Sequence, residues 1–339
     1  MKRIVYIVLI VTFCLRVDVA FSQNPPYTIT AYIDSNIIRT DDYSALHSIS
    51  YAGQGMRWMF DRRTDDWEYL NAYLFDVGFD DSITTEVQVN PEFGSSSNAM
   101  IEACKYAFII GQLPAFLRSE TQKIWIHQGD ESFGGGFNGV LIHTGGSPNY
   151  ESLGILEEVL FHEATHTALD PLYASDPGWI SAQNSDIGFI STYAASSPMI
   201  EDIAESFLAW FMVRQCERRL SGSDSITIAQ TIPNRIAFFD SLNVEMYPLC
   251  INGTLSNVNE YDIHSIDVYP NPVKDNFSLD VPSVLIGKYY GIYNVSGQCV
   301  VVGIIESNNN IINVHYLTTG VYFLNVGQEG FQTRKIIKL

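Results

Sequence analysis

Hydrophobic and polar positions follow two different patterns along the 339-residue chain, and the change falls near residue 264. Ahead of it, long apolar stretches at 99–109, 151–169 and 198–220 have the length and spacing of helices. Beyond it, short alternating segments recur between turn dipeptides such as Ser296-Gly297, which is typical of all-β structure. The patterning therefore predicts an α+β domain followed by a small all-β domain.

Shorter elements complete the expected order of the first domain. Alternation predicts strands at 27–33, 123–127 and 140–143. The helix at 151–169 is expected to end at Asp170-Pro171, because proline cannot continue a helix. The segment 173–196 is rich in Ser, Asp, Gly and Ala and is expected to be a loop, and a third, amphipathic helix is expected at 232–242.

The first 22 residues have the pattern of a secretory signal peptide. Lys2-Arg3 is followed by an apolar run over 4–15 and by small residues in Ala20-Phe21-Ser22. The apolar run is too short to span a membrane, and no later stretch approaches that length. We therefore expect a mature protein that is soluble and lies outside the cytoplasm.

Composition narrows the classes of partner. The net charge of −19 and the pI near 4.6 argue against nucleic acid and against anionic membranes as partners. Four cysteines follow the signal peptide, and an even count in an exported protein permits disulfides. Cys216 and Cys250 are the favoured pair, with Cys104 and Cys299 remaining. None has the Cys-x-x-Cys spacing of a metal site.

The chemistry-bearing motif is His162-Glu163-x-x-His166, inside the apolar helix at 151–169. Residues four apart lie on one face of a helix, so the two imidazoles can reach one metal. Glu163 is placed to reach a water at that metal, and zinc suits such ligands. The motif matches the zinc metallopeptidase signature. Two histidines on an ordinary helix are the alternative, which the apolar surroundings disfavour because buried ionisable groups need partners.

A third ligand is expected from the helix at 198–220, which Ser197-Pro198 would open. Glu201 and Glu205 lie one turn apart on it, and their spacing alone does not decide which one binds metal. Asp170, one turn beyond His166, is either an acceptor for a ligand histidine or a helix-terminal turn residue. The metzincin pattern is excluded, because Leu169 and Leu172 occupy its glycine and third-histidine positions.

Two other groups of residues are weaker candidates for a functional role. His127 and His143 could be metal ligands, although single histidines are more often structural or exposed. The stretch at 60–63 with Trp67 is charged and aromatic, and it could line a substrate cleft. A salt-bridged surface segment is the favoured interpretation of that stretch.

The segment Glu201-x-x-Ala204-Glu205-x-Phe207, with Tyr193 ahead of it, resembles the gluzincins, and most closely the lethal-factor family of metallopeptidases. The resemblance implies a zincin-like fold with Zn²⁺ held by His162, His166 and Glu201. It also implies that Glu205 orients His162, that Glu163 is the general base and that Tyr193 donates a hydrogen bond to the oxyanion. In zincins an edge strand ahead of the metal helix pairs with extended substrate, and we expect that strand at 136–143.

Three segments in the last part of the chain strongly resemble the C-terminal sorting domain of the type IX secretion system of Bacteroidetes. They are Val268-Tyr269-Pro270-Asn271-Pro272, the run 320–324 and the terminal run 335–338. The resemblance implies a small immunoglobulin-like sandwich that directs export across the outer membrane. Without it, the all-β region would be interpreted as a carbohydrate-binding or adhesive β-sandwich.

The expected domain order is a signal peptide at 1–22, a zincin-like metallopeptidase domain at 23–250, a linker at 251–263 and a sorting domain at 264–339. The expected function is that of a secreted zinc metallopeptidase, which hydrolyses a peptide or protein substrate by a zinc-bound water that Glu163 activates. A non-catalytic adhesion protein on the same fold is one alternative, and intact Glu163 argues against it. A zinc hydrolase of a non-peptide bond, such as a deacetylase, is another, and the expected edge strand favours peptide.

Overall fold

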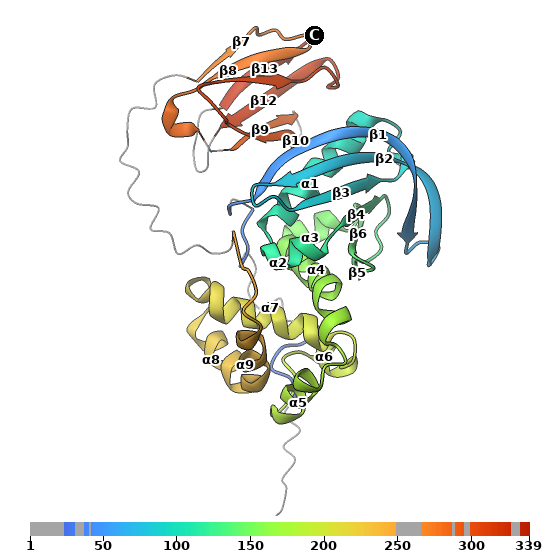
Figure 1. Ribbon diagram of the computed structural model, residues 1–339, viewed down its shortest axis with the longest axis vertical. Helices are drawn as coiled ribbons and strands as arrows, with labels where there is room; N and C mark the ends of the chain where they lie inside the picture. The colour runs from blue at the N-terminus through green and yellow to red at the C-terminus, as the bar shows by residue number, and fades with distance from the viewer. Residues whose placement is uncertain are drawn as a thin grey trace, which may run out of the picture.

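A computed structural model describes residues 24–30, 37–40, 42–248, 266–286, 289–294, 299–326 and 333–339. The expected signal peptide and the expected linker lie outside these residues. Of the strand predicted at 27–33, residues 27–30 form only an isolated bridge, in which Tyr27 pairs with Ser191, and the rest lies outside the described residues. The α+β and all-β regions appear in the predicted order (Figure 1).

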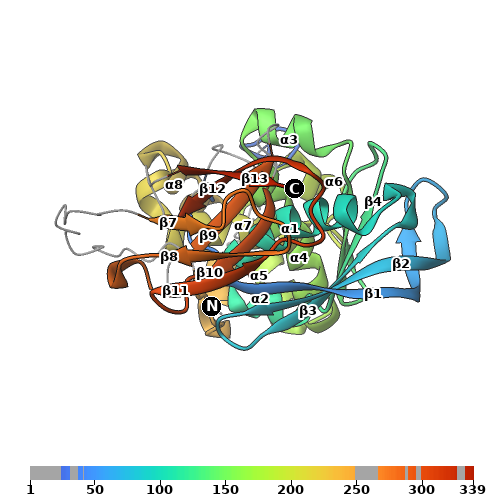
Figure 2. The ribbon, with the colours of Figure 1, turned by 90° about the horizontal axis from the view of Figure 1, so that it is seen from above.

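A six-stranded mixed sheet forms the framework of the first region, in the order β1-β2-β3-β4-β6-β5. Its strands are β1 (Leu46–Asp61), β2 (Asp66–Phe79), β3 (Thr84–Val89), β4 (Lys123–His127), β5 (Gly134–Gly136) and β6 (Gly139–His143). Strands β3, β4 and β6 are parallel, and the other pairs are antiparallel. The long β1–β2 hairpin projects beyond its neighbours, toward the right in Figures 1 and 2.

The strand predicted at 123–127 is confirmed as β4, but the predicted edge strand at 136–143 is wrong. Residues 139–143 of that segment form β6, which lies between β4 and β5, whereas Gly136 ends β5, the edge strand. The cause is the two-residue turn at Phe137 and Asn138, whose φ angles are 52° and 59°. Two consecutive left-handed residues close a tight hairpin, and this one folds the glycine run back outside β6.

Nine α-helices lie within the described part of the chain. They are α1 (Ser96–Gln112), α2 (Ala115–Glu120), α3 (Ser147–Leu153), α4 (Leu156–Tyr173), α5 (Pro177–Ser185), α6 (Thr192–Ser196), α7 (Asp202–Gln215), α8 (Gly222–Thr231) and α9 (Pro233–Leu242). The helices predicted at 99–109 and 232–242 are confirmed as α1 and α9. Helices α2 and α8 were not predicted.

The helix predicted at 151–169 differs from the structure at both ends. Gly154 adopts φ 67° and separates α3 from α4, because a left-handed residue ends a helix. At the other end α4 continues through Pro171 to Tyr173, so Asp170-Pro171 does not end it. Proline there removes only one hydrogen bond of the last turn, and the N–H of Ala174 still reaches the carbonyl of Asp170.

The loop predicted at 173–196 is wrong, because two helices with side-chain caps form within it. The carboxylate of Asp176 accepts hydrogen bonds from Gly178 N and Trp179 N at the start of α5. The hydroxyl of Ser191 accepts one from Ala194 N at the start of α6. Capping residues therefore nucleate helices in a stretch whose composition suggested a loop.

Helix α7 begins at Asp202 and ends at Gln215, so the prediction of 198–220 was too long at both ends. Ser197 follows α6, and its carbonyl accepts hydrogen bonds from Ile200 N at 3.0 Å and Glu201 N at 2.8 Å. These bonds make residues 198–201 a turn, and Glu201 becomes the N-cap residue of α7. A short 3₁₀ turn, η2 (Glu217–Arg219), follows α7.

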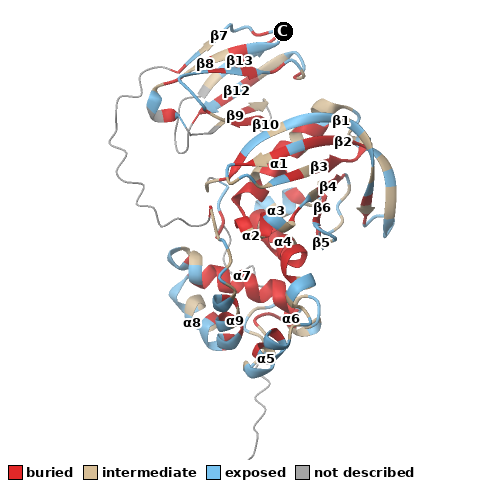
Figure 3. Cartoon of the chain, in the orientation of Figure 1, coloured by how far each residue is buried: buried red, intermediate tan, exposed pale blue. Residues whose placement is uncertain are grey.

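Helices α4 and α7 form the centre of the core, and both are buried along most of their length (Figure 3). Phe161 of α4 stacks against Phe207 and Phe211 of α7, with ring centroids 5.6 and 4.7 Å apart. Cys104 of α1 is buried. Cys216 after α7 is disulfide-bonded, and the predicted partner Cys250 lies outside the described residues.

The predicted all-β region is confirmed as two antiparallel sheets around a core of their own. One sheet has the order β10-β9-β12-β13, from β9 (Tyr289–Asn294), β10 (Cys299–Ile304), β12 (Gly320–Val326) and β13 (Thr333–Lys338). The other has the order β11-β8-β7, from β7 (Asp267–Tyr269), β8 (Asn276–Asp280) and β11 (Asn309–Asn313). Within the described residues, no helix combines the length and apolar character needed to cross a membrane.

Candidate metal centre

Helix α4 carries both motif histidines on its buried face. One helical turn separates His162 from His166, and their side chains are 4% and 9% exposed. Their rings lie 4.8 Å apart at 78°, so both Nε2 atoms can approach one point. The distance between the two Nε2 atoms is 3.1 Å.

Glu201 completes the group from the N-cap of α7. Its Oε2 atom lies 3.3 Å from Nε2 of His162 and 3.1 Å from Nε2 of His166. Among the described residues, these three are the cluster of histidine, cysteine and acidic side chains that could hold a metal ion. The turn at 198–201 is what brings this carboxylate to α4, because it sets where α7 begins.

The donor set fits zinc on two counts. Two imidazole nitrogens and one carboxylate oxygen are ligands that zinc prefers in catalytic sites. Four ligands at about 2.0 Å from a tetrahedral centre lie about 3.3 Å from one another. The three observed separations, 3.1 to 3.3 Å, are close to that edge length.

A second carboxylate lies behind each histidine. Oε1 of Glu205 is 3.3 Å from Nδ1 of His162, and Oδ2 of Asp170 is 2.9 Å from Nδ1 of His166. A carboxylate at Nδ1 favours a proton on that nitrogen and leaves Nε2 as the donor atom for a metal. Glu201 and Glu205 therefore occupy different positions, since only Glu201 reaches the Nε2 side.

The hydroxyl of Ser191 holds Glu205 in place. It donates a 2.6 Å hydrogen bond to Oε2 of Glu205, and both residues are fully buried. The same hydroxyl caps α6, the helix that carries Tyr193. Ser191 was not predicted as a site residue. A serine ahead of a helix gives a capping signal, but its contact with Glu205 depends on long-range folding.

The electrostatic balance of the cluster is dominated by its carboxylates. Burial lowers the pKa of His162, but Glu201 and Glu205 outweigh it and raise the pKa to about 10. Burial is likewise outweighed at His166, whose pKa is raised to about 9 by Asp170 and Glu201. Burial opposes ionisation of Glu201, yet the two histidines hold its pKa well below the usual range. Without a metal, the carboxylates of the cluster therefore favour protonated, positively charged imidazoles. A bound cation would supply that positive charge instead.

Tyr193 of α6 lies beside the cluster with its side chain partly open to solvent. Its ring stacks on His162 at 6.4 Å, and its hydroxyl interacts with Glu201. Burial and this carboxylate raise the pKa of Tyr193, so the phenol stays protonated at neutral pH. The N-terminal segment fixes its backbone, because Tyr193 N donates to Ile29 O at 2.8 Å and Thr192 N to Tyr27 O at 2.9 Å.

Glu163 is half-buried on α4, next to the edge strand β5. A Cβ atom on Gly135 would lie 1.8 Å from the carbonyl oxygen of Glu163, so β5 approaches α4 as closely as glycine permits. Thr167 fastens the strand, because its hydroxyl accepts from Gly136 N at 2.9 Å and donates to Gly139 O at 2.8 Å. The sheet edge therefore lies directly beside the motif residues.

The other two candidate histidines form a separate buried group. Nδ1 of His127 lies 2.9 Å from Nδ2 of Asn90, and Nδ1 of His143 lies 2.9 Å from the carbonyl of Gln128. Asp61 is 3.3 Å from His127 and 3.9 Å from His143. Burial lowers the pKa of His127 to about 4, so this imidazole is neutral. Neither histidine is part of the described metal-compatible cluster.

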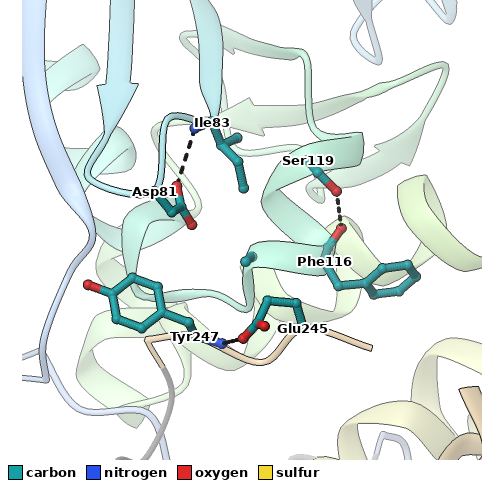
Figure 4. Close-up of a pocket in the computed structure, with 7 residues that line it drawn as sticks. Asp81, Ile83, Phe116, Ser119, Glu245 and Tyr247 are labelled. Carbon is teal, nitrogen blue, oxygen red and sulfur yellow. Dashed lines mark hydrogen bonds between the residues drawn. The ribbon is translucent and has the colours of Figure 1, made fainter. Parts of the chain in front are cut away.

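A surface pocket lies elsewhere on the molecule (Figure 4). It is lined by residues of the turn between β2 and β3, of α2 and of the segment after α9, among them Asp81, Phe116 and Tyr247. None of its lining residues belongs to the metal-compatible cluster. We assign it no role, because its polar groups are largely engaged with one another or with Arg118.

Comparison with known families concerns the last part of the chain. Residues 267–339 match the family described as the secretion system C-terminal sorting domain. The protein is therefore exported. Its location is the cell surface or the medium, and the type IX secretion machinery is a partner. Among curated proteins, no match was found to this chain.

Proposed function

We propose that the first region is a zinc-dependent peptidase of the gluzincin type, acting outside the cytoplasm. The observation that carries this proposal is the convergence of Nε2 of His162, Nε2 of His166 and Oε2 of Glu201 within 4.8 Å of one another. Glu163 directly follows the first of these ligands, on a helix that borders a sheet edge.

The proposed roles follow from the donor set. His162, His166 and Glu201 would hold the ion, with Glu205 and Asp170 orienting the two rings. Zinc in this position would act as a Lewis acid toward a substrate carbonyl and lower the pKa of water. Glu163 would accept the proton of the attacking water on its carboxylate and pass it to the leaving amine.

Tyr193 would supply a hydrogen bond to the carbonyl oxygen of the substrate as negative charge develops there. Its raised pKa supports this role, because a protonated phenol is needed as a donor. Its position beside Glu201 supports it further, since the scissile group would have to approach the same ion.

The finer fold assignments belong to the same proposal. A helix with the ligand histidines beneath a mixed sheet, an edge strand against that helix and a second helix with the third ligand support a zincin-like fold. The two-sheet arrangement of seven strands after residue 266 supports an immunoglobulin-like sandwich for the sorting domain.

The test uses the full mature chain with zinc and a mixture of unstructured peptides. We expect cleavage that a chelator abolishes and added zinc restores. Glu163→Gln should retain zinc but lose about two to four decades of kcat/KM, the usual range for removal of a general base. Zinc content, measured by mass spectrometry, distinguishes a variant that binds zinc but is inactive from a variant that has lost its zinc.

Two results would overturn the proposal. A zinc-loaded wild type that cleaves no peptide would favour a binding protein, and release of acetate from acetylated substrates would favour a hydrolase of another bond. Normal turnover in zinc-loaded Glu163→Gln would remove Glu163 from the mechanism.

A further inference from the structure

The turn between β1 and β2 places Arg62 across the edge strand. A terminal nitrogen of Arg62 lies 2.7 Å from the point that a Cβ atom on Gly134 would occupy, and its Cζ lies 3.6 Å away. Successive strand residues face opposite sides, and Gly135 faces Glu163 of α4. The guanidinium therefore lies on the opposite side of β5 from α4, where glycine leaves room for it.

The turn that presents Arg62 is fixed from one side by buried polar groups. Asp61 is 1% exposed, and its carboxylate accepts from the backbone N of Arg63 at 2.9 Å and from the Arg63 guanidinium. Arg63 also pairs with Glu92 at 2.8 Å. His127, 3.3 Å from Asp61, closes the group beneath the turn. The buried group of Asp61, Arg63 and His127 therefore has a structural role in holding the turn, although it is not part of the proposed metal centre.

Aromatic contacts fix the turn from its other side. Trp67, on the second strand of the hairpin, packs edge-on against Trp125 at 5.3 Å and against Phe137 at 5.4 Å. Phe137 belongs to the turn between β5 and β6, and 75% of its surface is exposed. The hairpin tip is thus fastened to the strand pair whose outer member borders α4.

Arg62 itself is free to bind a ligand. It is exposed, and no carboxylate among the described residues lies within ion-pair distance of it, in contrast with its neighbour Arg63. Arg62 and the proposed base, Glu163, also both influence the pKa of Tyr150. Burial and Glu163 raise the pKa of Tyr150, whereas Arg62 lowers it, so both charges lie near that phenol.

We propose that Arg62 binds a carboxylate of a peptide that lies along the free edge of β5, which makes acidic peptides the preferred substrate class. A guanidinium pairs with a carboxylate through two parallel hydrogen bonds, which gives both affinity and orientation. The chain carries a net charge of −19, so its general field repels such a ligand and recognition has to come from a local cation. This inference rests on the proposed peptidase function.

The experiment compares matched peptides that differ only in Glu against Gln at successive positions around the cleaved bond. Each is made with a free or an amidated C-terminus, so that side-chain and terminal carboxylates are distinguished. We expect the wild type to prefer a Glu peptide, or one with a free C-terminus, by about tenfold in kcat/KM. Arg62→Ala should lose the preference, and Arg62→Glu should reverse it in favour of Lys.

Arg218→Ala is the matched control. Arg218 is an exposed arginine in η2, so this substitution removes the same charge from a different element. It should retain the preference. Equal rates for the Glu and Gln peptides in the wild type, or an unchanged ratio in Arg62→Ala, would overturn the inference.

Binding separates this inference from the peptidase proposal. Fluorescence anisotropy with labelled peptides on zinc-loaded Glu163→Gln needs no turnover. If the wild type cleaves nothing but Glu163→Gln still binds the Glu peptide about tenfold more tightly than the Gln peptide, the peptidase proposal fails and Arg62 keeps its role. If both peptides bind equally, the role of Arg62 fails whatever the activity.

Discussion

Two pairs of buried histidines lie in the first region, and they differ in where their ring nitrogens point. His162 and His166 have carboxylates at Nδ1, and their Nε2 atoms approach within 3.1 Å of each other. In the second pair each Nδ1 contacts a neutral group as well as a carboxylate: Asn90 and Asp61 for His127, the Gln128 carbonyl and Glu131 for His143. The two rings stack at 5.4 Å and 26°, and no third ligand joins them in the described residues. Burial is similar in both pairs, so burial does not decide which pair can take a metal.

The number of carboxylates is the second difference between the pairs. Glu201, Glu205 and Asp170 surround the first pair and raise the pKa values of both rings. Two carboxylates lie near the second pair: Asp61, which Arg63 engages, and Glu131, which lies 3.5 Å from Nδ1 of His143. Burial lowers the pKa of His127. At the first pair the carboxylates outweigh the effect of burial on the imidazole pKa, whereas at His127 burial prevails. This difference supports the proposal that the first pair, and not the second, would hold a cation.

The largest effect should come from removing one ring of each pair. His166→Ala should lose zinc on dialysis, because one of the three proposed ligands is gone. His127→Gln should retain an equimolar zinc content, since its ring faces Asn90 and Asp61. Metal analysis of both folded variants, with circular dichroism as the check on folding, measures this. Zinc loss in the His127 variant alone would reverse the assignment of the two pairs.

The next effect distinguishes the carboxylates on the two sides of His162. Glu201→Ala should abolish tight zinc binding, because Glu201 is the group on the Nε2 side. Glu205→Ala should weaken zinc affinity or activity by about 10–100-fold, the usual cost of removing a group that orients a ligand. Competition titration with a chromophoric chelator gives both values. The assignment is reversed if Glu201→Ala binds zinc tightly and Glu205→Ala does not.

The second pair should make stability depend on pH on the acid side. The pKa of His127 is about 4 in the folded protein and about 6.5 in the unfolded chain. The resulting stabilisation is present above pH 6.5 and is lost as the pH falls through 4. At pH 4.5 the loss should be on the order of 2 kcal/mol. Urea unfolding of metal-free wild type and His127→Gln at pH 7 and 4.5 should show a smaller decline in the variant, and equal declines would contradict the assignment.

The smallest effect should come from Ser191, which does not contact the first histidine pair but holds Glu205 beside His162. Ser191→Ala removes the bond to Glu205 and the cap of α6, and each should cost about 1 kcal/mol of unfolding free energy. Zinc affinity should fall by less than about 10-fold, because Glu205 remains. Ser196→Ala on the same short helix is the control. An unchanged affinity in Ser191→Ala would show that Glu205 is held without it.

Local pattern was sufficient for part of this site and insufficient for the rest. The positions of His162, Glu163 and His166 on one helix follow from spacing, and their helix is present in the structure. The predicted C-terminal end of that helix was wrong, because one proline in the last turn removes only one backbone hydrogen bond and does not end the helix. The two helices inside 173–196 were missed because composition was weighed above the capping residues Asp176 and Ser191.

Long-range contacts account for what could not be predicted. The edge position of β5 depends on a tight turn at Phe137 and on the contact of glycines with α4, neither of which alternation reveals. The grouping of Asp61 with His127 and His143 joins residues far apart in sequence. Spacing alone left the choice between Glu201 and Glu205 open, and only the packing of α7 against α4 separates the two carboxylates.

The contact of Gly135 with Glu163 also limits how this scaffold could be redesigned. Any side chain at position 135 would lift β5 from α4, because its first carbon would meet a backbone oxygen at 1.8 Å. A graft of another edge strand would therefore displace the helix that carries the histidines. The tip at Arg62 and the turn at Phe137 are exposed and can be exchanged without that strain. If the first region is a peptidase as proposed, variation in substrate choice would therefore enter through those two turns, with the strand between them left as glycine.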